Sequence, residues 1–237
     1  MARRYWYVIS TYIIMQFSGL LFVPVLYFML PVSQEQAAIY WTIFSFIAGL
    51  IAVLIFMRPD MRQAPVRDNT SAGHLVLWSI AGVIMAYVAQ ALAVTIEVQL
   101  FGIKQGSQNT QVIMDITRAA PIFMIIPAII APILEEIIFR KIIFGELYVR
   151  TNFFIAATLS ALIFGIIHGE PEHILIYASM GFVFAFLYVK TKRIMVPIIV
   201  HMTLNSISLI VQLSLDPEDL ERMQRQMEQM QMILIGG

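Results

Sequence analysis

Apolar runs separated by short polar loops divide this chain from its first residues to beyond position 200. A helix needs about 20 mainly apolar residues to cross a bilayer, and most of these runs reach that length. Hydrophobic residues make up 59% of the chain and charged residues only 13%, whereas a soluble domain is nearer half apolar and a quarter charged. We therefore predict an all-α fold, a polytopic bundle of about seven transmembrane helices. The expected spans are about 5–30, 38–57, 74–101, 119–144, 153–168, 173–189 and 194–215. We expect the polar segment 102–115 to be a loop and residues 145–152 to turn the chain.

The last residues, 216–237, differ in pattern from the predicted transmembrane domain at 1–215. Asp216 and Pro217 are typical of a helix N-cap followed by a proline at the first helical position. Apolar side chains then recur every three or four positions between Glu and Gln residues, at Leu220, Met223, Met227, Met230 and Leu234. This spacing predicts a C-terminal amphipathic helix, which could lie on the membrane surface, pack on a partner helix or fold back on its own bundle.

The basic residues are distributed unevenly between the loops on the two sides of the predicted bundle. A cytoplasmic N-terminus places on the cytoplasmic side Arg3, Arg4, Arg58, Arg62, Arg67, Arg140, Lys141, Arg150, Lys190, Lys192 and Arg193. The opposite side then keeps only Lys104, Arg118, Arg222 and Arg225. Because Lys and Arg concentrate in cytoplasmic loops, we predict a multi-pass protein of the cell membrane with its N-terminus in the cytoplasm.

Two classes of chemistry are disfavoured by composition. The formal net charge is +0, and the chain has no basic stripe of the kind that binds nucleic acid. The chain has no cysteine, which excludes disulfides, thiolate zinc sites and a cysteine nucleophile.

The fourth predicted span contains two adjacent carboxylates, Glu135 and Glu136, followed by Arg140. Ionisable groups at membrane depth are costly and usually face a polar interior, so they indicate a functional site. Glu136 and Arg140 are four residues apart, in the favourable acid-before-base order, and we predict that they form an ion pair. Glu135 points about 100° away around the helix, which leaves it available for chemistry. The alternative is that both carboxylates only pair with basic residues on neighbouring helices.

The same span also contains three prolines, Pro121, Pro127 and Pro132. Each proline removes a backbone hydrogen bond, and a transmembrane helix tolerates this only where neighbouring groups satisfy the freed carbonyls. The sequence therefore predicts kinks, or a partly re-entrant path, in the segment that carries the carboxylates.

Further polar groups occur in the later spans. His168 ends the fifth span, and His201 and Asn205 lie four residues apart, on one helical face, in the seventh. Side chains from facing helices converge in bundle interiors. A freed Glu in a low-dielectric cavity can act as general base on a water molecule, with a His sharing that water. A second His beside an Asn can donate hydrogen bonds to a developing oxyanion. Alternatively, Glu135, His168 and His201 could bind a divalent metal such as zinc, with an open fourth position.

These residues form three short motifs, which occur in order along the chain. They are Glu-Glu-x-x-x-Arg at Glu135, Glu136 and Arg140, Phe-x-x-x-His at Phe164 and His168, and His-x-x-x-Asn at His201 and Asn205. The set resembles the motifs of the CPBP intramembrane endopeptidase family, which includes CaaX prenyl proteases and bacteriocin-processing or immunity proteins. The resemblance covers about residues 119–210.

The resemblance implies an endopeptidase that cuts a peptide or membrane-protein substrate in or next to the lipid bilayer. In that reading Glu135 activates water with assistance from His168, while His201 and Asn205 stabilise the oxyanion. The Glu136 ion pair would hold the motif helix in place. The family has been described both as metalloproteases and as glutamate-dependent enzymes, so no cofactor is certain and zinc stays open.

Two other functions are compatible with the same residues. The first is a non-catalytic peptide-binding or bacteriocin-immunity membrane protein that retains the motifs. The second is a proton-coupled transporter, in which buried Glu and His residues form a proton relay. Against the transporter, no inverted repeat is visible, and the polar groups cluster late in the chain.

Overall fold

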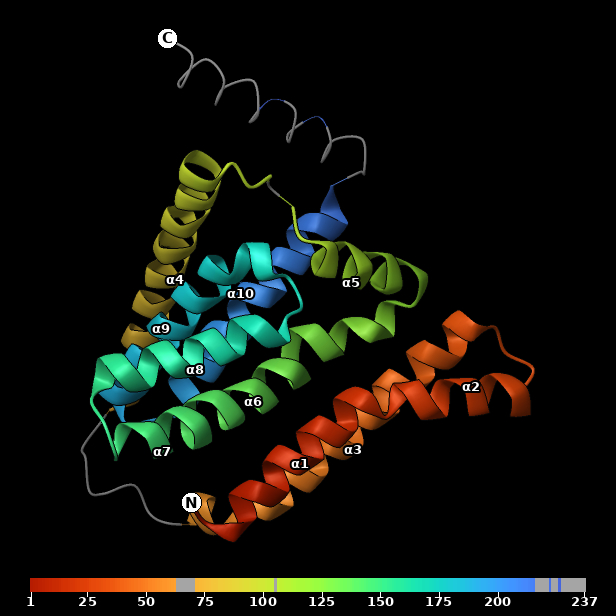
Figure 1. Cartoon of the computed structure of the whole chain (residues 1–237), viewed down its shortest axis with the longest axis horizontal. Coiled ribbons are helices and arrows are strands. Elements are labelled where there is room, and N and C mark those ends of the chain that lie inside the picture. The colour runs from red at the N-terminus through yellow and green to blue at the C-terminus, as the bar shows by residue number, and fades with distance from the viewer. Residues whose placement is uncertain (63–70, 105, 216–221, 223–225, 227–237) are drawn as a thin grey trace.

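The computed structural model describes residues 1–62, 71–104, 106–215, 222 and 226. Every regular element within these residues is helical, and the bundle is shown in Figure 1. The elements are α1 (Arg3–Phe17), α2 (Gly19–Met29), α3 (Gln34–Arg62), α4 (Ala72–Phe101), α5 (Gln108–Ala119), η1 (Pro121–Met124), η2 (Ile126–Ile130), α6 (Ala131–Glu135), η3 (Glu136–Phe144), α7 (Gly145–Tyr148), α8 (Phe153–Ile167), η4 (Pro171–His173), α9 (Ile174–Thr191) and α10 (Met195–Ser214). The predicted all-α transmembrane bundle is therefore confirmed.

Five of the described helical segments are long and apolar enough to cross a membrane, and the bent pair of α1 and α2 makes a possible sixth. The apolar helix α8 is shorter than a full span. Together these segments account for the seven predicted spans. The C-terminal amphipathic helix, by contrast, was expected in a stretch that lies almost entirely outside the described residues.

We expected the first span to be one continuous helix, but the structure divides it into two. It breaks at Ser18, and the axes of α1 and α2 differ by 45°. The Ser18 hydroxyl donates to the carbonyl of Met15 and accepts a hydrogen bond from the indole N–H of Trp41 on α3. Side-chain hydrogen bonds to the preceding turn bend helices. The interaction with Trp41 fixes this bend against the neighbouring helix.

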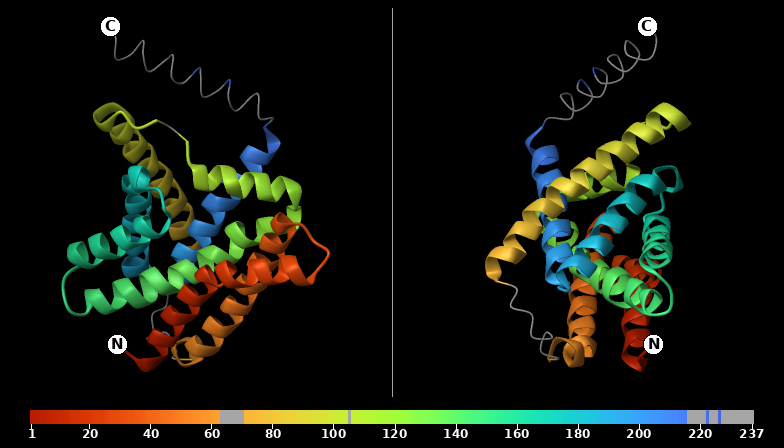
Figure 2. Two further views of the ribbon diagram at one scale, coloured as in Figure 1. Left: turned by 45° about the vertical axis from the view of Figure 1, so that its right-hand side comes forward. Right: turned by 90° about the vertical axis from the view of Figure 1, so that its left-hand side faces the viewer.

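The polar segment 102–115 was expected to be a loop, and this prediction is wrong for most of its length. Residues Gln108–Ala119 form the helix α5, which starts where Ser107 accepts a hydrogen bond from the Thr110 N–H. Met114 and Thr117 are its buried side chains. Helix α5 packs on η1 and α10, and the left view of Figure 2 shows it crossing α10. Likewise, the turn expected from Gly145 begins later, because α7 continues the helix to Tyr148.

The segment from Pro121 to Tyr148 forms the centre of the bundle. Buried residues make up 61% of its most apolar stretch, against 11% in α4. It contacts α1 and α3 on one side and α8, α9 and α10 on the other. Two parts of it, η2 and η3, are π-helical, with hydrogen bonds from residue i to i+5. Wide turns of this kind inside helices are frequent at functional sites. The segment still runs as one unit long enough to span a membrane, so the structure shows irregular hydrogen bonding where the prolines predicted kinks or a re-entrant path.

Helices α8 and α9 pack closely because glycines lie at their interface. A Cβ atom added at Gly181 would lie 2.9 Å from the Cβ of Ala161, and one added at Gly165 would lie 2.9 Å from Ile174 Cγ1. A larger side chain at either glycine would therefore clash, and small residues of this kind let transmembrane helices pack closely. The close approach brings the end of α8, which carries His168, against the first turns of α9.

Candidate active site

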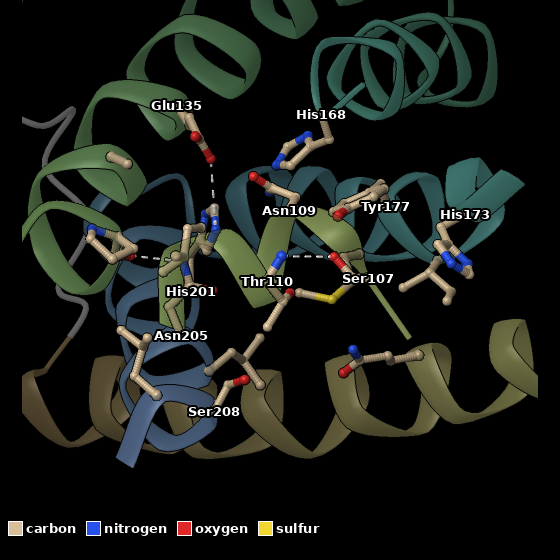
Figure 3. Close-up of a pocket in the computed structure, with 18 of the residues that line it drawn as sticks. Ser107, Asn109, Thr110, Glu135, His168, His173, Tyr177, His201, Asn205 and Ser208 are labelled. Atoms are coloured by element: carbon tan, nitrogen blue, oxygen red, sulfur yellow. Dashed lines mark hydrogen bonds and ion pairs between the residues drawn. The ribbon is translucent and has the colours of Figure 1, made fainter. Parts of the chain in front are cut away.

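A cavity of about 930 Å³ lies among the helices and is lined by all four of the predicted catalytic residues. They are Glu135 from α6, His168 at the end of α8, and His201 and Asn205 from α10. In Figure 3 the side chains of Glu135 and His168 enter the cavity from different helices, and His201 lies beneath Glu135. Helices α1, α3, α4 and α5 complete the walls. The fold thus brings three separate motifs to one space.

Beside the cavity, Glu136 and Arg140 form the predicted ion pair, with Arg140 Nη1 and Glu136 Oε1 3.2 Å apart. Both side chains are almost completely buried, with 1% and 0% of their surface exposed. The guanidinium carbon of Arg140 lies 4.4 Å from the ring centroid of Phe164 and 5.0 Å from that of Phe184. Aromatic faces attract a desolvated cation, so Phe164 supports the pair from α8.

The hydrogen bonding of this pair is nevertheless incomplete. Glu136 Oε2 and the Arg140 atoms Nη1 and Nη2 are buried without a hydrogen-bond partner among the described residues. Charge and aromatic faces, more than hydrogen bonds, hold Arg140 in place. A buried charge that loses its partner is strongly destabilising, so this cluster depends on both members being present.

His201 lies between the two adjacent carboxylates. Its Nδ1 is 2.8 Å from Glu136 Oε1, and its Nε2 is 3.7 Å from Glu135 Oε2. Since a carboxylate only accepts hydrogen bonds, Nδ1 carries a hydrogen that it donates to Glu136. The Nε2 atom then faces Glu135, at 3.7 Å from its Oε2 atom.

Glu135 differs from Glu136 in what surrounds it. Its side chain is 13% exposed and lines the cavity, whereas Glu136 is fully buried. Consecutive helical positions point in directions about 100° apart, which is why one carboxylate reaches the cavity and the other Arg140. Glu135 is therefore the carboxylate that a water molecule or substrate in the cavity can contact.

His168 ends α8 with its ring fixed at one edge. Its Nδ1 is 2.7 Å from the carbonyl oxygen of Phe164 in the preceding turn. A carbonyl oxygen can only accept, so Nδ1 carries a hydrogen, and in the neutral ring Nε2 has the lone pair. The ring stacks on Tyr177 of α9, with centroids 4.1 Å apart and planes inclined by 23°. The His168 ring is thus held in one orientation at the cavity wall.

Asn205 makes a contact that its motif did not predict. Its Nδ2 donates to the carbonyl oxygen of Pro127 at 2.9 Å. Pro127 lies in the π-helical segment η2, where the N–H of Ala131 bonds to the carbonyl of Ile126, five residues earlier. In the same pattern, the carbonyl of Pro127 would accept from the N–H of residue 132. Because Pro132 has no N–H, the carbonyl of Pro127 is left free and Asn205 satisfies it. An amide nitrogen has two hydrogens, so one remains for another acceptor.

The residues suggested as metal ligands do not come together as a three-ligand set. Among the described residues, no three His, Cys, Asp or Glu side chains are close enough to hold a metal ion. Glu135 and His201 are neighbours at 3.7 Å, but structural and catalytic zinc sites use at least three protein ligands. The arrangement of these side chains does not match a two-His, one-Glu zinc site, and we derive no step from a metal.

A second polar cluster at the cavity rim was missed by sequence reasoning. Glu170, in the turn after α8, accepts hydrogen bonds from the Tyr177 hydroxyl at 2.6 Å, the Ser107 hydroxyl at 2.8 Å and the Asn109 N–H at 2.9 Å. Burial acts to raise the pKa of Glu170, but these donors outweigh it and hold the pKa below its usual value of 4.5. A Glu in a Gly-Glu-Pro turn gave no sequence signal of this role, because its donors lie in a segment expected to be a loop.

Glu97 and His173 form a third polar contact on the cavity wall. His173 Nδ1 is 2.9 Å from Glu97 Oε2, and His173 Nε2 is 2.8 Å from the carbonyl of Gly106. Glu97 Oε1 also accepts from the backbone N–H of Ile176. This contact ties α4 to the start of α9 and to the chain that leads into α5. The only sequence signal was a lone acid near the end of an apolar span.

Taken together, the described residues form a membrane-embedded helical bundle with Glu, His and Asn side chains around an internal cavity. Residues 117–207 match the family described as Type II CAAX prenyl endopeptidase Rce1-like. The chain is 44% identical over 246 residues to the putative membrane peptidase YdiL of Bacillus subtilis (strain 168), a match covering 100% of this chain and 99% of that protein. The membrane-embedded CAAX protease MroQ of Staphylococcus aureus (strain USA300) is 36% identical over 223 residues, covering 89% of each chain.

The chain therefore belongs to the CPBP family of intramembrane endopeptidases, as its motifs indicated. Membership identifies it as a peptide hydrolase of the membrane. No solved structure matches the chain significantly.

Proposed function

We propose that this protein hydrolyses a peptide bond in or next to the membrane, using a water molecule that Glu135 activates. The observation that carries the proposal is the contrast between the adjacent carboxylates. Glu136 is buried against Arg140, whereas Glu135 reaches the cavity wall with His201 Nε2 3.7 Å away. A carboxylate in a partly desolvated cavity is a suitable general base when its pKa is close to the working pH.

The proposed reaction begins with water held between Glu135 and the scissile carbonyl. Glu135 removes a proton from the water as its oxygen attacks the carbonyl carbon, and a tetrahedral oxyanion forms. The proton then passes to the leaving amine as the C–N bond breaks, which gives a carboxylic acid and an amine. The Nε2 lone pair of His168, on the cavity wall, would accept a hydrogen bond from the same water.

Two groups on α10 would stabilise the oxyanion. His201 can donate from Nε2 when it is protonated, and its Nδ1–H is anchored on Glu136. Asn205 keeps one amide hydrogen after bonding to the Pro127 carbonyl. Donors held in advance of the reaction are the most effective in a low-dielectric site. Arg140 supports His201 through its ion pair with Glu136, and Phe164 packs against Arg140 and also lines the cavity.

The substrate we propose is a peptide or a membrane-protein segment that enters the cavity from the bilayer. The names of the two relatives, a putative membrane peptidase and a membrane-embedded CAAX protease, support this class of substrate. The distribution of Lys and Arg among the loops supports a location in the cell membrane with the N-terminus in the cytoplasm.

The test compares purified full-length wild type with Glu135→Gln on a library of labelled membrane peptides. We expect Glu135→Gln to lower the cleavage rate by about 10²–10⁴-fold, the usual contribution of a general base, and to leave thermal stability unchanged. The matched control is Glu172→Gln, an exposed carboxylate near the cavity rim, which should cut at the wild-type rate. Cleavage by Glu135→Gln at that same rate would overturn the proposal, and loss of wild-type cleavage with a chelator would require a metal.

A further inference from the structure

We infer that Glu170 and Tyr177 are positioning residues for His168, and that the start of α5 is part of the same support. This inference rests on the proposed role of His168 beside the attacking water. None of the three family motifs includes Glu170, Tyr177 or any residue of α5. The inference follows from the hydrogen bond and the two aromatic contacts that hold the imidazole ring.

The orientation of the His168 ring decides where its Nε2 lone pair points. The Nδ1 edge is fixed by the Phe164 carbonyl at 2.7 Å. Phe164 lies on α8, the helix that His168 ends, and this single hydrogen bond still allows the imidazole ring to tilt about the Nδ1–O direction. The Phe164 ring also contacts the imidazole, with centroids 4.5 Å apart and planes at 63°. Both of these contacts come from α8, so a supporting contact from another helix is needed to restrict the tilt.

Tyr177 supplies that support. Its ring lies nearly parallel to His168 at a centroid distance of 4.1 Å, close enough to prevent the imidazole from tilting. The Tyr177 ring is itself held, because its hydroxyl donates to Glu170 Oε2 at 2.6 Å. In Figure 3 Tyr177 lies beside His168 on the same wall of the cavity. The stack is therefore anchored at its far end by a short charge-assisted hydrogen bond.

Glu170 in turn is fixed by α5. The Ser107 hydroxyl donates to the same oxygen that receives Tyr177, and the Asn109 N–H donates to the other oxygen. A carboxylate at a helix N-terminus is also stabilised by the helix dipole. Only 5% of the surface of Glu170 is exposed, so no large solvent-facing motion competes with these bonds. The start of α5, Glu170, Tyr177 and His168 form one continuous series of contacts.

This series links a cavity wall to His168. Asn109, Thr110 and Ile113 of α5 line the cavity, so α5 contacts whatever occupies it. When α5 is docked, Glu170 holds Tyr177 and the His168 lone pair faces the cavity. If α5 moves away, Glu170 loses two of its three donors and the His168 ring loses its external support. The contacts thereby couple the docked position of α5 to the orientation of the His168 ring.

The first test uses three variants of the full-length protein in the peptide-cleavage assay. Tyr177→Leu removes the stack and should lower kcat by about 100-fold, the effect of misplacing a catalytic group by about 1 Å. Tyr177→Phe keeps the stack but loses the anchor, and should lower kcat by roughly tenfold or less. Glu170→Gln should resemble Tyr177→Phe, and the two changes should not be additive because they break the same contact. KM should change little in all three.

The matched control for these variants is Tyr40→Phe, a hydroxyl deletion on the exposed surface of α3, which should leave kcat unchanged. Equal kcat for wild type and both Tyr177 variants would overturn the inference. So would a change confined to KM, because it would make Tyr177 a substrate contact instead of a support for His168.

The second test does not depend on cleavage. In the full-length protein in detergent, ¹⁵N NMR of labelled histidine should report His168 as the single Nδ1–H tautomer in wild type and in Tyr177→Phe. In Tyr177→Leu we expect averaging between tautomers, and His168→Gln assigns the signal. An unchanged His168 signal in Tyr177→Leu would refute the positioning role while leaving Glu135-dependent cleavage intact. Conversely, a positive NMR result with no Glu135 dependence would retain the positioning and reject the proposed mechanism.

Discussion

Two Glu–Arg pairs with the same spacing lie on the same stretch of chain and have opposite surroundings. Glu136–Arg140 and Glu146–Arg150 are both four-residue pairs, with N–O distances of 3.2 Å and 3.3 Å. In the first pair the Arg and Glu side chains are 1% and 0% exposed, and in the second they are 65% and 27% exposed. Identical local spacing thus gives a buried cluster beside a cavity in one case and a surface pair in the other.

The difference shows that the environment, not the pair itself, decides its importance. Two unit charges at this distance attract weakly in water and far more strongly where the effective dielectric constant is low. Burial also removes hydration from each charge, so the deep pair is stable only while both members are present. The surface pair keeps its hydration and contributes little. The third group at the deep pair is His201, 2.8 Å from Glu136 and on the cavity wall, whereas the third group at the surface pair is the N-terminal amino group.

The largest effect on stability is expected from removing Arg140, the cation of the buried pair. Arg140→Ala leaves Glu136 as a buried charge without a counter-ion and should lower the free energy of unfolding by about 3–5 kcal/mol. The yield of monodisperse protein should fall, and the midpoint of thermal unfolding in detergent should drop with it. Cleavage should be lost as well, because His201 is bonded to the stranded carboxylate.

A double change checks that the stranded charge is the cause. Replacing both members, as Glu136→Gln with Arg140→Gln, should unfold at a higher temperature than Arg140→Ala alone, since no unpaired charge remains. If Arg140→Ala expresses and unfolds like wild type, the ion pair does not stabilise the bundle and the comparison between the two pairs fails.

An intermediate effect is expected at Asn205, where a neutral group satisfies a buried backbone carbonyl. Asn205→Ala frees the Pro127 carbonyl and should lower the free energy of unfolding by about 1–3 kcal/mol. Adding Pro132→Ala supplies an N–H that can bond to that carbonyl in the i to i+5 pattern of this segment. Thermal unfolding of the single and double variants in detergent measures the recovery.

Activity separates the two roles of Asn205. If its second amide hydrogen stabilises the oxyanion, Pro132→Ala should restore stability to the Asn205→Ala protein without restoring cleavage. Recovery of both would make Asn205 a purely structural residue. No recovery of stability would show that the Pro127 carbonyl does not depend on Asn205.

Sequence alone was sufficient for contacts within one helix and insufficient for contacts between segments. The Glu136–Arg140 pair follows from helical periodicity and the cost of buried charge, and the spans follow from their length. Asn205 and Pro127 could not be paired in advance, because their contact depends on which carbonyl a π-helical turn leaves free. The Glu170 cluster was missed because α5 was taken for a loop. Its N-cap at Ser107, followed by Ile113, Met114 and Ile116, was the available signal.

The smallest effect is expected at the surface pair, which makes it the control for the comparison. Arg150→Ala removes the 3.3 Å contact with Glu146, yet both groups remain accessible to water, and Glu146 also pairs with the N-terminal amino group at 3.4 Å. The free energy of unfolding should change by less than about 1 kcal/mol, with no loss of cleavage. Thermal unfolding beside Arg140→Ala in the same detergent measures both at once. A loss at Arg150 as large as that at Arg140 would mean that spacing, and not depth, determines the contribution of a Glu–Arg pair in this bundle.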